Sequence, residues 1–191
     1  MGIQPREFAE TYLNQLQETI RNLPQDDIAQ LISWVSEARE QDRTIFVVGN
    51  GGSATTASHF ATDMGKGASL GRARRFHILS LTDNAGWITA LGNDLSYDDV
   101  FVEQLANFAK PGDLVVAISV SGNSPNVVKA IQWAKSHGCR SIGLIGAKGG
   151  RLRDLVDLPI VVPTEHFGRA EDAHLIITHI VGYFFIEVER I

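Results

Sequence analysis

The hydrophobic residues of the chain follow two spacings. Runs such as 44–48 (Thr-Ile-Phe-Val-Val) are typical of buried strands, whereas apolar residues three or four positions apart, such as Phe8, Tyr12 and Leu16, are typical of amphipathic helices. These spacings predict helices at 5–23 and 26–40, strands at 44–48, 76–81, 113–118, 141–145 and 158–162, and helices at 54–65, 84–92, 98–108, 125–137 and 169–189. Strands that alternate with helices predict an α/β fold, in which helices cover both faces of a parallel sheet.

Two loops rich in glycine and serine follow two of these strands and open the next helices. They are 49–53 (Gly-Asn-Gly-Gly-Ser) and 119–124 (Ser-Val-Ser-Gly-Asn-Ser). A helix N-terminus presents unpaired N–H groups and the positive end of the helix dipole, and glycine lets an anion come close to the backbone. Parallel sheets also bind ligands beyond the carboxyl ends of their strands. The two loops therefore predict a site for a phosphorylated small molecule.

The second loop also has a purely structural interpretation. Pro125 suits the first position of a helix, where its missing N–H costs nothing, and Ser124 suits the N-cap before it. For Ser124 alone, helix capping is the simpler explanation. Three serines with glycine and asparagine within six residues favour a ligand.

Composition and charge narrow the class of protein. The chain has 191 residues, of which 44% are hydrophobic, enough for a sizeable core in a single domain spanning 1–191. The net charge of −5 argues against a nucleic-acid surface, and the cluster of Arg72, Arg74 and Arg75 is expected to be a solvated loop. Cys139 is the single cysteine, so no intrachain disulfide can form. With no signal segment and no run long enough to span a membrane, we expect a soluble, cytoplasmic protein.

Titratable residues are concentrated on two of the predicted helices. His59 and Asp63 are four residues apart on the helix after the first loop, so they share one face. The last helix carries two acids and two histidines, namely Glu171, Asp172, His174 and His179. Gathered at one point, such residues would form a divalent-metal site, most simply for zinc, or an acid–base set for proton transfer. Taken singly, the first pair is equally well explained as an ordinary helix pair, and His174 is better explained as a surface or core histidine.

The first loop also satisfies a dinucleotide-binding fingerprint. Gly49-x-Gly51-x-x-Ala54 follows a predicted strand and Asp83 follows the next one, which makes a nicotinamide-dependent enzyme an alternative. However, Asp83 lies farther along the chain than the usual spacing of about 20 residues. The fingerprint also leaves the loop 119–124 unexplained, so no nucleotide cofactor is expected.

In their order along the chain, these motifs resemble the sugar isomerase (SIS) domain family, and most closely its phosphoheptose isomerase branch. The resemblance covers nearly the whole chain and rests on 49–54 (Gly-Asn-Gly-Gly-Ser-Ala), 59–61 (His-Phe-Ala), 92–94 (Gly-Asn-Asp), 119–124 and 169–179. It implies a three-layer αβα sandwich with a parallel five-stranded, flavodoxin-like sheet. It also implies a homotetramer with shared active sites. The first two predicted helices carry apolar stripes that need a partner, which is either another subunit, with residues 1–42 as a helical extension that packs in the oligomer, or their own domain.

The resemblance further implies an activity and roles for single residues. The activity is the conversion of sedoheptulose 7-phosphate to D-glycero-D-manno-heptose 7-phosphate, a ketose to an aldose, by proton transfer through an enediol. Asp63 takes the place of the catalytic base and His179 that of the partner acid. The zinc-associated positions of the family fall on His59, Asp63, Glu171 and His179. The positions that contact the substrate fall on Asn50, Gly51, Gly52, Ser53, Asn93, Asp94, Ser119, Val120, Ser121, Ser124 and Glu171, with the three serines of the second loop on the phosphate.

Three of these positions depart from the pattern of the family. Asp63 stands where glutamate is usual, which shortens the reach of the base by about 1.5 Å and puts its alignment in question. Glu171 replaces the usual glutamine, and its added negative charge would strengthen a metal site or raise the pKa of a neighbouring carboxylate. Val120 replaces the usual threonine, which removes one hydroxyl but keeps the backbone N–H.

A non-catalytic protein of the same fold is the alternative function. It would be an adaptor of the replication-initiation type, which uses the fold as a tetrameric protein-binding platform, or a sugar-phosphate sensor. The adaptor branch generally lacks the histidine of the last helix, whereas this chain keeps His179. An isomerase is therefore the expected function.

Overall fold

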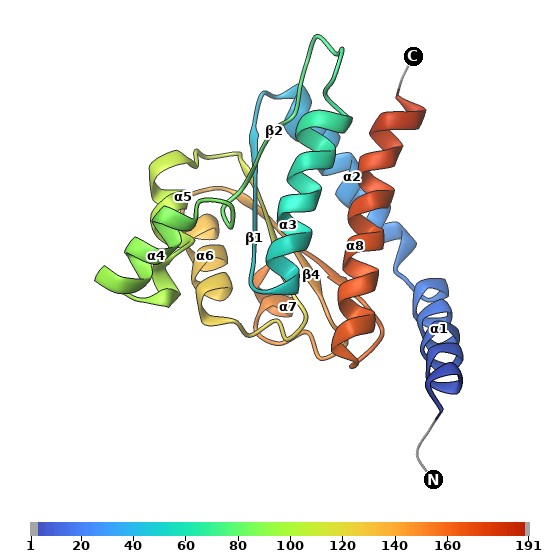
Figure 1. The fold of residues 1–191 in the computed structure, drawn as a ribbon. Helices are drawn as coiled ribbons and strands as arrows, with labels where there is room; N and C mark the ends of the chain where they lie inside the picture. The colour runs from blue at the N-terminus through green and yellow to red at the C-terminus, as the bar shows by residue number, and fades with distance from the viewer. Residues whose placement is uncertain (1–3, 190–191) are drawn as a thin grey trace.

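Five parallel strands form the centre of the computed structural model, which describes residues 4–189. Figure 1 shows the sheet with helices packed around it. The strands are β1 (Thr44–Gly49), β2 (His77–Ser80), β3 (Leu114–Ser119), β4 (Arg140–Ile145) and β5 (Leu158–Val161). Their order in the sheet is β2-β1-β3-β4-β5, and each neighbouring pair is parallel. This is the flavodoxin-like order, which confirms the fold expected from the sequence.

The order of the strands places both glycine- and serine-rich loops at one point. β1 and β3 are neighbours, but the chain continues from β1 to β2 on one side and from β3 to β4 on the other. Ligands of such sheets bind at this switch point, outside the carboxyl ends of the strands. The loops 49–53 and 119–124 follow β1 and β3, so both lie there. A dinucleotide-binding Rossmann sheet has a different order, 3-2-1-4-5-6, which disfavours the nicotinamide alternative.

Helices cover both faces of the sheet and enclose two hydrophobic cores. Ile45 and Val47 of β1 face one core, and Phe46 and Val48 face the other, as expected for alternating side chains of a strand buried on both faces. The helices on the first side are α1 (Pro5–Arg21), α2 (Gln25–Glu40), α3 (Gly52–Thr62) and α8 (Phe167–Tyr183), and those on the second are α4 (Ala85–Asp94), α5 (Val102–Phe108), α6 (Pro125–Ser136) and α7 (Leu152–Leu155).

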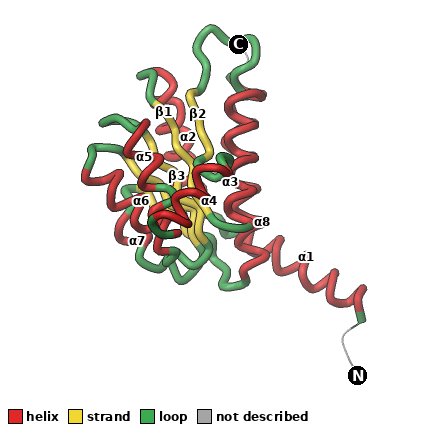
Figure 2. The backbone as a smooth tube through the Cα atoms, turned by 60° about the vertical axis from the view of Figure 1, so that its left-hand side comes forward, coloured by secondary structure: helices red, strands yellow, loops and turns green. Residues whose placement is uncertain are grey.

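The first helix extends away from the sheet. Figure 2 shows α1 projecting from the body of the molecule, where it meets the beginning of α8. Within residues 4–189, none of the helices combines the length and apolar character needed to cross a bilayer.

Two long helices predicted from the sequence end in wider turns. The helix predicted at 54–65 is α3 followed by a π-helical turn at Asp63–Gly67, and the helix predicted at 169–189 is α8 followed by a π-helical turn at Phe184–Val188. The two turns pack together: a Cβ on Gly67 would come within 3.1 Å of Ile186. Hydrophobic periodicity does not reveal such a turn, because it inserts one extra residue without breaking the helix.

The prediction of one helix at 98–108 is wrong in part. The chain forms a 3₁₀ turn at Tyr97–Asp99 and then α5. Ser96 is the N-cap of this turn, where its hydroxyl accepts the Asp98 N–H at 3.0 Å and donates to the Asp99 carboxylate at 2.9 Å. Helix α7 was not predicted, because four residues are too few to show a period. The other predicted elements lie within two residues of the observed bounds.

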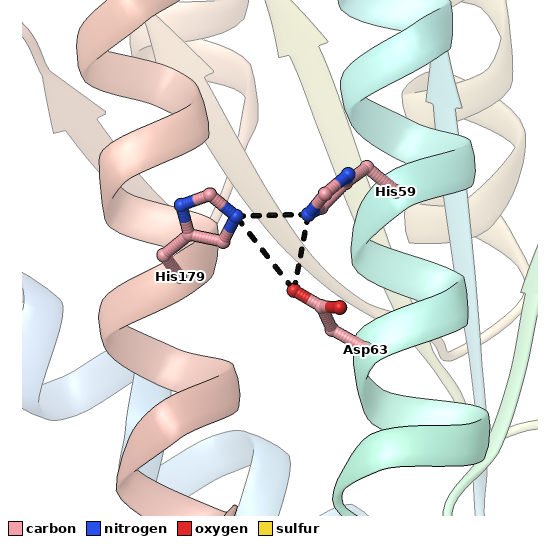
Figure 3. Close-up of side chains that lie close together, drawn as sticks. All are labelled: His59, Asp63 and His179. Carbon is pink, nitrogen blue, oxygen red and sulfur yellow. Dashed lines mark hydrogen bonds and ion pairs between the residues drawn. The ribbon is translucent and has the colours of Figure 1, made fainter.

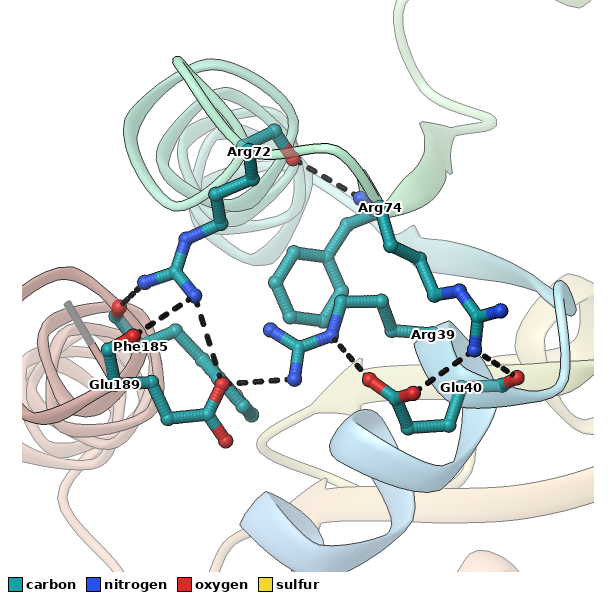
Figure 4. Close-up of polar contacts among 8 residues, drawn as sticks. Arg39, Glu40, Arg72, Arg74, Phe185 and Glu189 are labelled. Atoms are coloured by element: carbon teal, nitrogen blue, oxygen red, sulfur yellow. Dashed lines mark hydrogen bonds and ion pairs between the residues drawn. The ribbon is translucent and has the colours of Figure 1, made fainter. Parts of the chain in front are cut away.

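The arginine-rich segment before β2 is not simply a solvated loop. The Arg72 guanidinium donates to the carbonyl oxygens of Phe185 and Glu189, where the end of the last helix leaves carbonyl groups unpaired (Figure 4). Arg74 pairs with the Glu40 carboxylate at 2.8 Å. The expectation of a solvated cluster is therefore wrong for Arg72, which caps the C-terminal end of the helix.

One histidine lies inside the sandwich without hydrogen bonds. His174 of α8 is fully buried, and neither ring nitrogen has a partner among the described residues. Burial disfavours the charged imidazolium and lowers the pKa of His174 to about 4. The backbone of Ile145 is near enough to offset part of this pKa shift, but it does not form a hydrogen bond with the ring. The interpretation of His174 as a core residue is confirmed, although its ring is not satisfied there.

We expect His174 to make the protein less stable in acid. The pKa of a histidine is about 6.5 in the unfolded chain but about 4 here, so the unfolded state binds more protons between these pH values. The free energy of unfolding therefore falls as the pH falls, by about 3 kcal/mol from this residue at pH 4. Urea unfolding measures this loss. Between pH 7 and pH 4, the free energy of unfolding of the His174→Leu variant should fall by about 3 kcal/mol less than that of the parent.

A control for this experiment is His137→Gln, which changes an exposed histidine at the end of α6. This variant should keep the pH dependence of the parent. A His174→Leu variant that loses as much stability in acid as the parent would contradict the expectation.

Candidate active site

The first loop turns tightly between β1 and α3. Gly51 has a φ of +54°, in the left-handed region that favours glycine, and Gly52 opens the helix. A Cβ on Gly52 would come within 2.5 Å of the Glu171 carboxylate of α8. The absence of a side chain at this position therefore lets Glu171 lie directly against the N-terminus of α3.

The second loop leaves its serine hydroxyls free of capping bonds. Ser124 occupies the N-cap position of α6 and Pro125 the first helical position, as predicted. The interpretation of Ser124 as a capping side chain is wrong, because its hydroxyl makes no capping bond and lies 3.4 Å from that of Ser119. Both hydroxyls are therefore available to a ligand.

The two loops and the first turn of α8 enclose a pocket of about 180 Å³. Its lining residues are Asn50, Ser53, Ile118, Ser119, Val120, Ser121, Ser124, Phe167 and Glu171. No lysine or arginine is among them, so an anion would be held by hydroxyls, backbone N–H groups and the N-termini of α3 and α6. Larger grooves of about 630 and 640 Å³ lie elsewhere, but neither loop lines them.

A small amide network fixes the first loop. The side chains of Asn50 and Asn126 exchange hydrogen bonds of 2.8 and 2.9 Å, and the Tyr97 hydroxyl donates to Asn50 at 3.1 Å. Asn126 is only 1% exposed. Sequence reasoning missed Asn126 and Tyr97, because neither belongs to a motif and their partner lies far away along the chain.

The structure does not bring Asn93 and Asp94 to the pocket. Both residues are exposed at the end of α4, where the Asn93 amide donates to the Asp94 carboxylate at 2.8 Å. Neither lines the pocket, so a role of these residues in binding a substrate stays a prediction.

Three side chains with metal-binding atoms converge between α3 and α8. Nε2 of His59 lies 2.8 Å from Nε2 of His179 (Figure 3). Oδ2 of Asp63 lies 3.2 Å from the His59 nitrogen and 3.8 Å from the His179 nitrogen. The two helices both start at the pocket and run side by side (Figure 1). His59 is seven residues beyond Gly52, so the cluster lies about 10 Å along the helix axis from the loop.

The packing around Asp63 fits a cation among the three residues. Oδ2 is shielded from solvent but has no hydrogen-bond partner among the described residues. Two imidazole nitrogens and one carboxylate oxygen are a common donor set for zinc, whose ligands stand about 3.3 Å apart when Zn–N is about 2.0–2.1 Å. The observed separations of 2.8 to 3.8 Å lie on either side of that value. The site can therefore hold a divalent metal ion or serve as an acid–base group.

Glu171 lies at the pocket and not in this cluster. Its carboxylate rests against Gly52, and it makes no hydrogen bond or ion pair with the described residues. Eight residues separate it from His179, which is about 12 Å along a helix. The structure thus brings together three of the four predicted metal residues, and a role of Glu171 as a ligand stays a prediction.

Comparison with known proteins places the chain in a family. The family model described as SIS domain matches residues 8–146. The phosphoheptose isomerase of Geobacter sulfurreducens is 42% identical over 154 residues, which cover 81% of each chain.

Two solved structures share the fold over almost their whole length. The phosphoheptose isomerase of Neisseria gonorrhoeae superposes with a TM-score of 0.85 and 28% identity, over 95% of this chain and 98% of that one. The enzyme of Francisella tularensis superposes with a TM-score of 0.89 and 26% identity, over 97% of this chain and 100% of that one. The chain therefore belongs to the SIS domain family and, within it, to the phosphoheptose isomerases.

Proposed function

We propose that the protein is an aldose–ketose isomerase that converts sedoheptulose 7-phosphate to D-glycero-D-manno-heptose 7-phosphate. The observation that carries the proposal is the course of α3 and α8, which start at a small anion pocket and bring His59, Asp63 and His179 together farther along. The name shared by the relatives, phosphoheptose isomerase, supports this substrate.

The length of the substrate agrees with the spacing of the two groups. Eight bonds separate C1 from the phosphorus of a seven-carbon 7-phosphate, and an extended chain advances about 1.2 Å per bond, or about 10 Å in all. The three-residue cluster also lies about 10 Å along α3 from the loop. A sugar with its phosphate in the pocket would therefore present C1 and C2 to the cluster.

The phosphate would be held without a cationic side chain. Ser119, Ser121 and Ser124 offer hydroxyl donors, and α3 and α6 direct their N-termini at the pocket. Val120 still offers its N–H to the same group, so the loss of the usual threonine hydroxyl leaves the phosphate site in place.

The reaction moves one proton between C1 and C2 and one between their oxygens. The Asp63 carboxylate would take the proton from one carbon, which leaves an enediol, and would return it to the other carbon. His179 would carry the proton between the two oxygens as the partner acid. Zinc, if held by His59, Asp63 and His179, would leave no proton on Nε2 of His179, so the metal would then stabilise the developing oxyanion in place of the imidazole.

The oligomer is part of the same proposal. Phe8 and Leu13 of α1 are 59% and 62% exposed, and Ile180 and Tyr183 of the neighbouring α8 are 42% and 50% exposed. Apolar surface of this kind is covered in symmetric assemblies, so we propose a homotetramer in which the extension 1–42 packs against other copies through α1, while α2 packs on the sheet of its own chain. We also propose a cytoplasmic location, which suits a phosphorylated substrate.

We expect Asp63→Asn and His179→Ala to lower turnover about thousandfold, because each removes a group that transfers a proton. The fold should persist, since both residues are partly exposed. The measurement is an NMR assay of the conversion of sedoheptulose 7-phosphate, with thermal unfolding as the test of folding. Elemental analysis should also find less zinc in both variants than in the parent.

The control variant is Glu165→Gln, which changes an exposed acid outside the site and should keep parental turnover. Normal turnover by both site variants would contradict the assignment of base and acid. Substrate binding without any turnover by the parent would instead favour a sugar-phosphate sensor or adaptor.

We expect Ser119→Ala and Ser124→Ala each to raise KM about tenfold while kcat changes little, because each removes a hydrogen bond to the charged phosphate. Steady-state kinetics with sedoheptulose 7-phosphate measures both constants. Ser136→Ala is the matched control, since Ser136 is an exposed serine at the other end of α6. Serine-loop variants with a parental KM would place the phosphate elsewhere.

A further inference from the structure

The first turn of α8 faces the pocket with one side and α1 with another. Phe167 and Glu171 are four residues apart and line the pocket. Gly168 and Asp172 are also four residues apart and contact Tyr12 of α1. A single helical turn thus joins the pocket to the projecting helix.

Tyr12 contacts this turn from its beginning to its end. Its hydroxyl donates to Oδ2 of Asp172 at 2.5 Å, and its ring packs edge-on against His166 with 5.6 Å between ring centroids. The Arg169 guanidinium lies 5.7 Å from the centre of the same ring. The hydrogen bond to Asp172 is the main reason that the pKa of Tyr12 is raised, so the hydroxyl keeps its proton.

The fit between the two helices depends on a glycine. A Cβ on Gly168 would lie 3.0 Å from the Tyr12 hydroxyl, closer than nearly all such contacts. The missing side chain therefore gives the hydroxyl its path to Asp172. A second bond from α8 to α1 lies nearby, where Arg169 donates to Gln15 at 2.6 Å.

The first turn of a helix needs such support because its N–H groups lack partners within the helix. Here the N-cap is His166, whose Nδ1 accepts the Arg169 N–H at a long 3.3 Å. Phe167 is 63% exposed, so the core does not hold it in place. Contact with Tyr12 at His166 and at Asp172 supports both ends of this turn.

We propose that Tyr12 is a positioning residue for substrate binding. Its hydroxyl, through Asp172, fixes the first turn of α8 and thereby holds Phe167 beside the pocket and the Glu171 carboxylate against Gly52, so that this negative charge does not move onto the bound phosphate. The substrate named in this inference rests on the proposed function. The same contact links α1, the helix proposed to pack in the oligomer, to the site that binds the phosphate.

The test removes only the hydroxyl. Tyr12→Phe should raise KM for sedoheptulose 7-phosphate about fivefold and leave kcat unchanged, because it loosens the walls of the pocket without touching the proton-transfer groups. The Kd for inorganic phosphate, measured by calorimetry, should rise by a similar factor. Asp172→Ala should have the same effect, and the double variant should bind no more weakly than either single variant.

Matched controls separate positioning from general damage. Glu10→Gln changes an exposed residue of the same helix and should keep the parental KM and Kd. Tyr12→Phe should also keep the parental unfolding temperature and the parental mass in sedimentation. A changed mass would mean that Tyr12 acts through assembly, which would overturn the proposal.

Two further results would overturn it. The first is a Tyr12→Phe variant with the KM and the phosphate Kd of the parent. The second is a variant with both Tyr12→Phe and Asp172→Ala in which the increase in KM is the product of the increases in the two single variants. If the parent turns over no sugar phosphate, the proposed function fails, but the phosphate titration still decides the role of Tyr12. A parent that does not bind phosphate at all would overturn both.

Discussion

The parallel, side-by-side course of α3 and α8 is the constraint on which the site depends. Both helices start at the switch point of the sheet, so α3 brings its N-terminus and α8 its first turn to the same small pocket. Because they then run in the same direction, residues farther along each helix meet again, as His59 and His179 do with 2.8 Å between ring nitrogens. One packing arrangement thus sets both ends of a site for a long, singly phosphorylated substrate.

The residues that depart from the family pattern keep this arrangement. Asp63 is a shorter acid than glutamate, but Gly182 of α8 faces it, and a Cβ there would lie 3.5 Å from the Asp63 Cβ. That distance is an ordinary van der Waals contact, so α8 packs closely against Asp63, whose short carboxylate still meets the two imidazoles. Glu171 lies against a glycine, Gly52, and its negative charge opposes the phosphate, so the serine hydroxyls and the helix N-termini must outweigh it in a pocket that contains no lysine or arginine.

Much of this fold could be predicted from sequence because its signals are local. Buried strands such as β1 show as short apolar runs, and the two glycine- and serine-rich loops mark the carboxyl ends of β1 and β3, where sheets of this kind bind ligands. Contacts between distant segments leave no such signal. Arg72 caps a helix 113 residues away through a backbone carbonyl, and Tyr12 reaches Asp172 across 160 residues. Only the family resemblance predicted that His59 and His179 meet. The same resemblance placed Glu171 with them, but eight residues along α8 separate Glu171 from His179.

The parallel course of α3 and α8 fixes the distance between a phosphate bound in the serine loop and the cluster of His59, Asp63 and His179, and this distance can be measured. Cobalt(II) added to the protein would relax the ³¹P signal of bound sedoheptulose 7-phosphate according to the distance between the cobalt ion and the phosphorus atom. With the phosphate in the serine loop and the metal at His59, Asp63 and His179, the account predicts a separation of about 10 Å. A phosphorus atom within about 4 Å of the metal, as in direct coordination, or a ³¹P signal unaffected by cobalt, would contradict it.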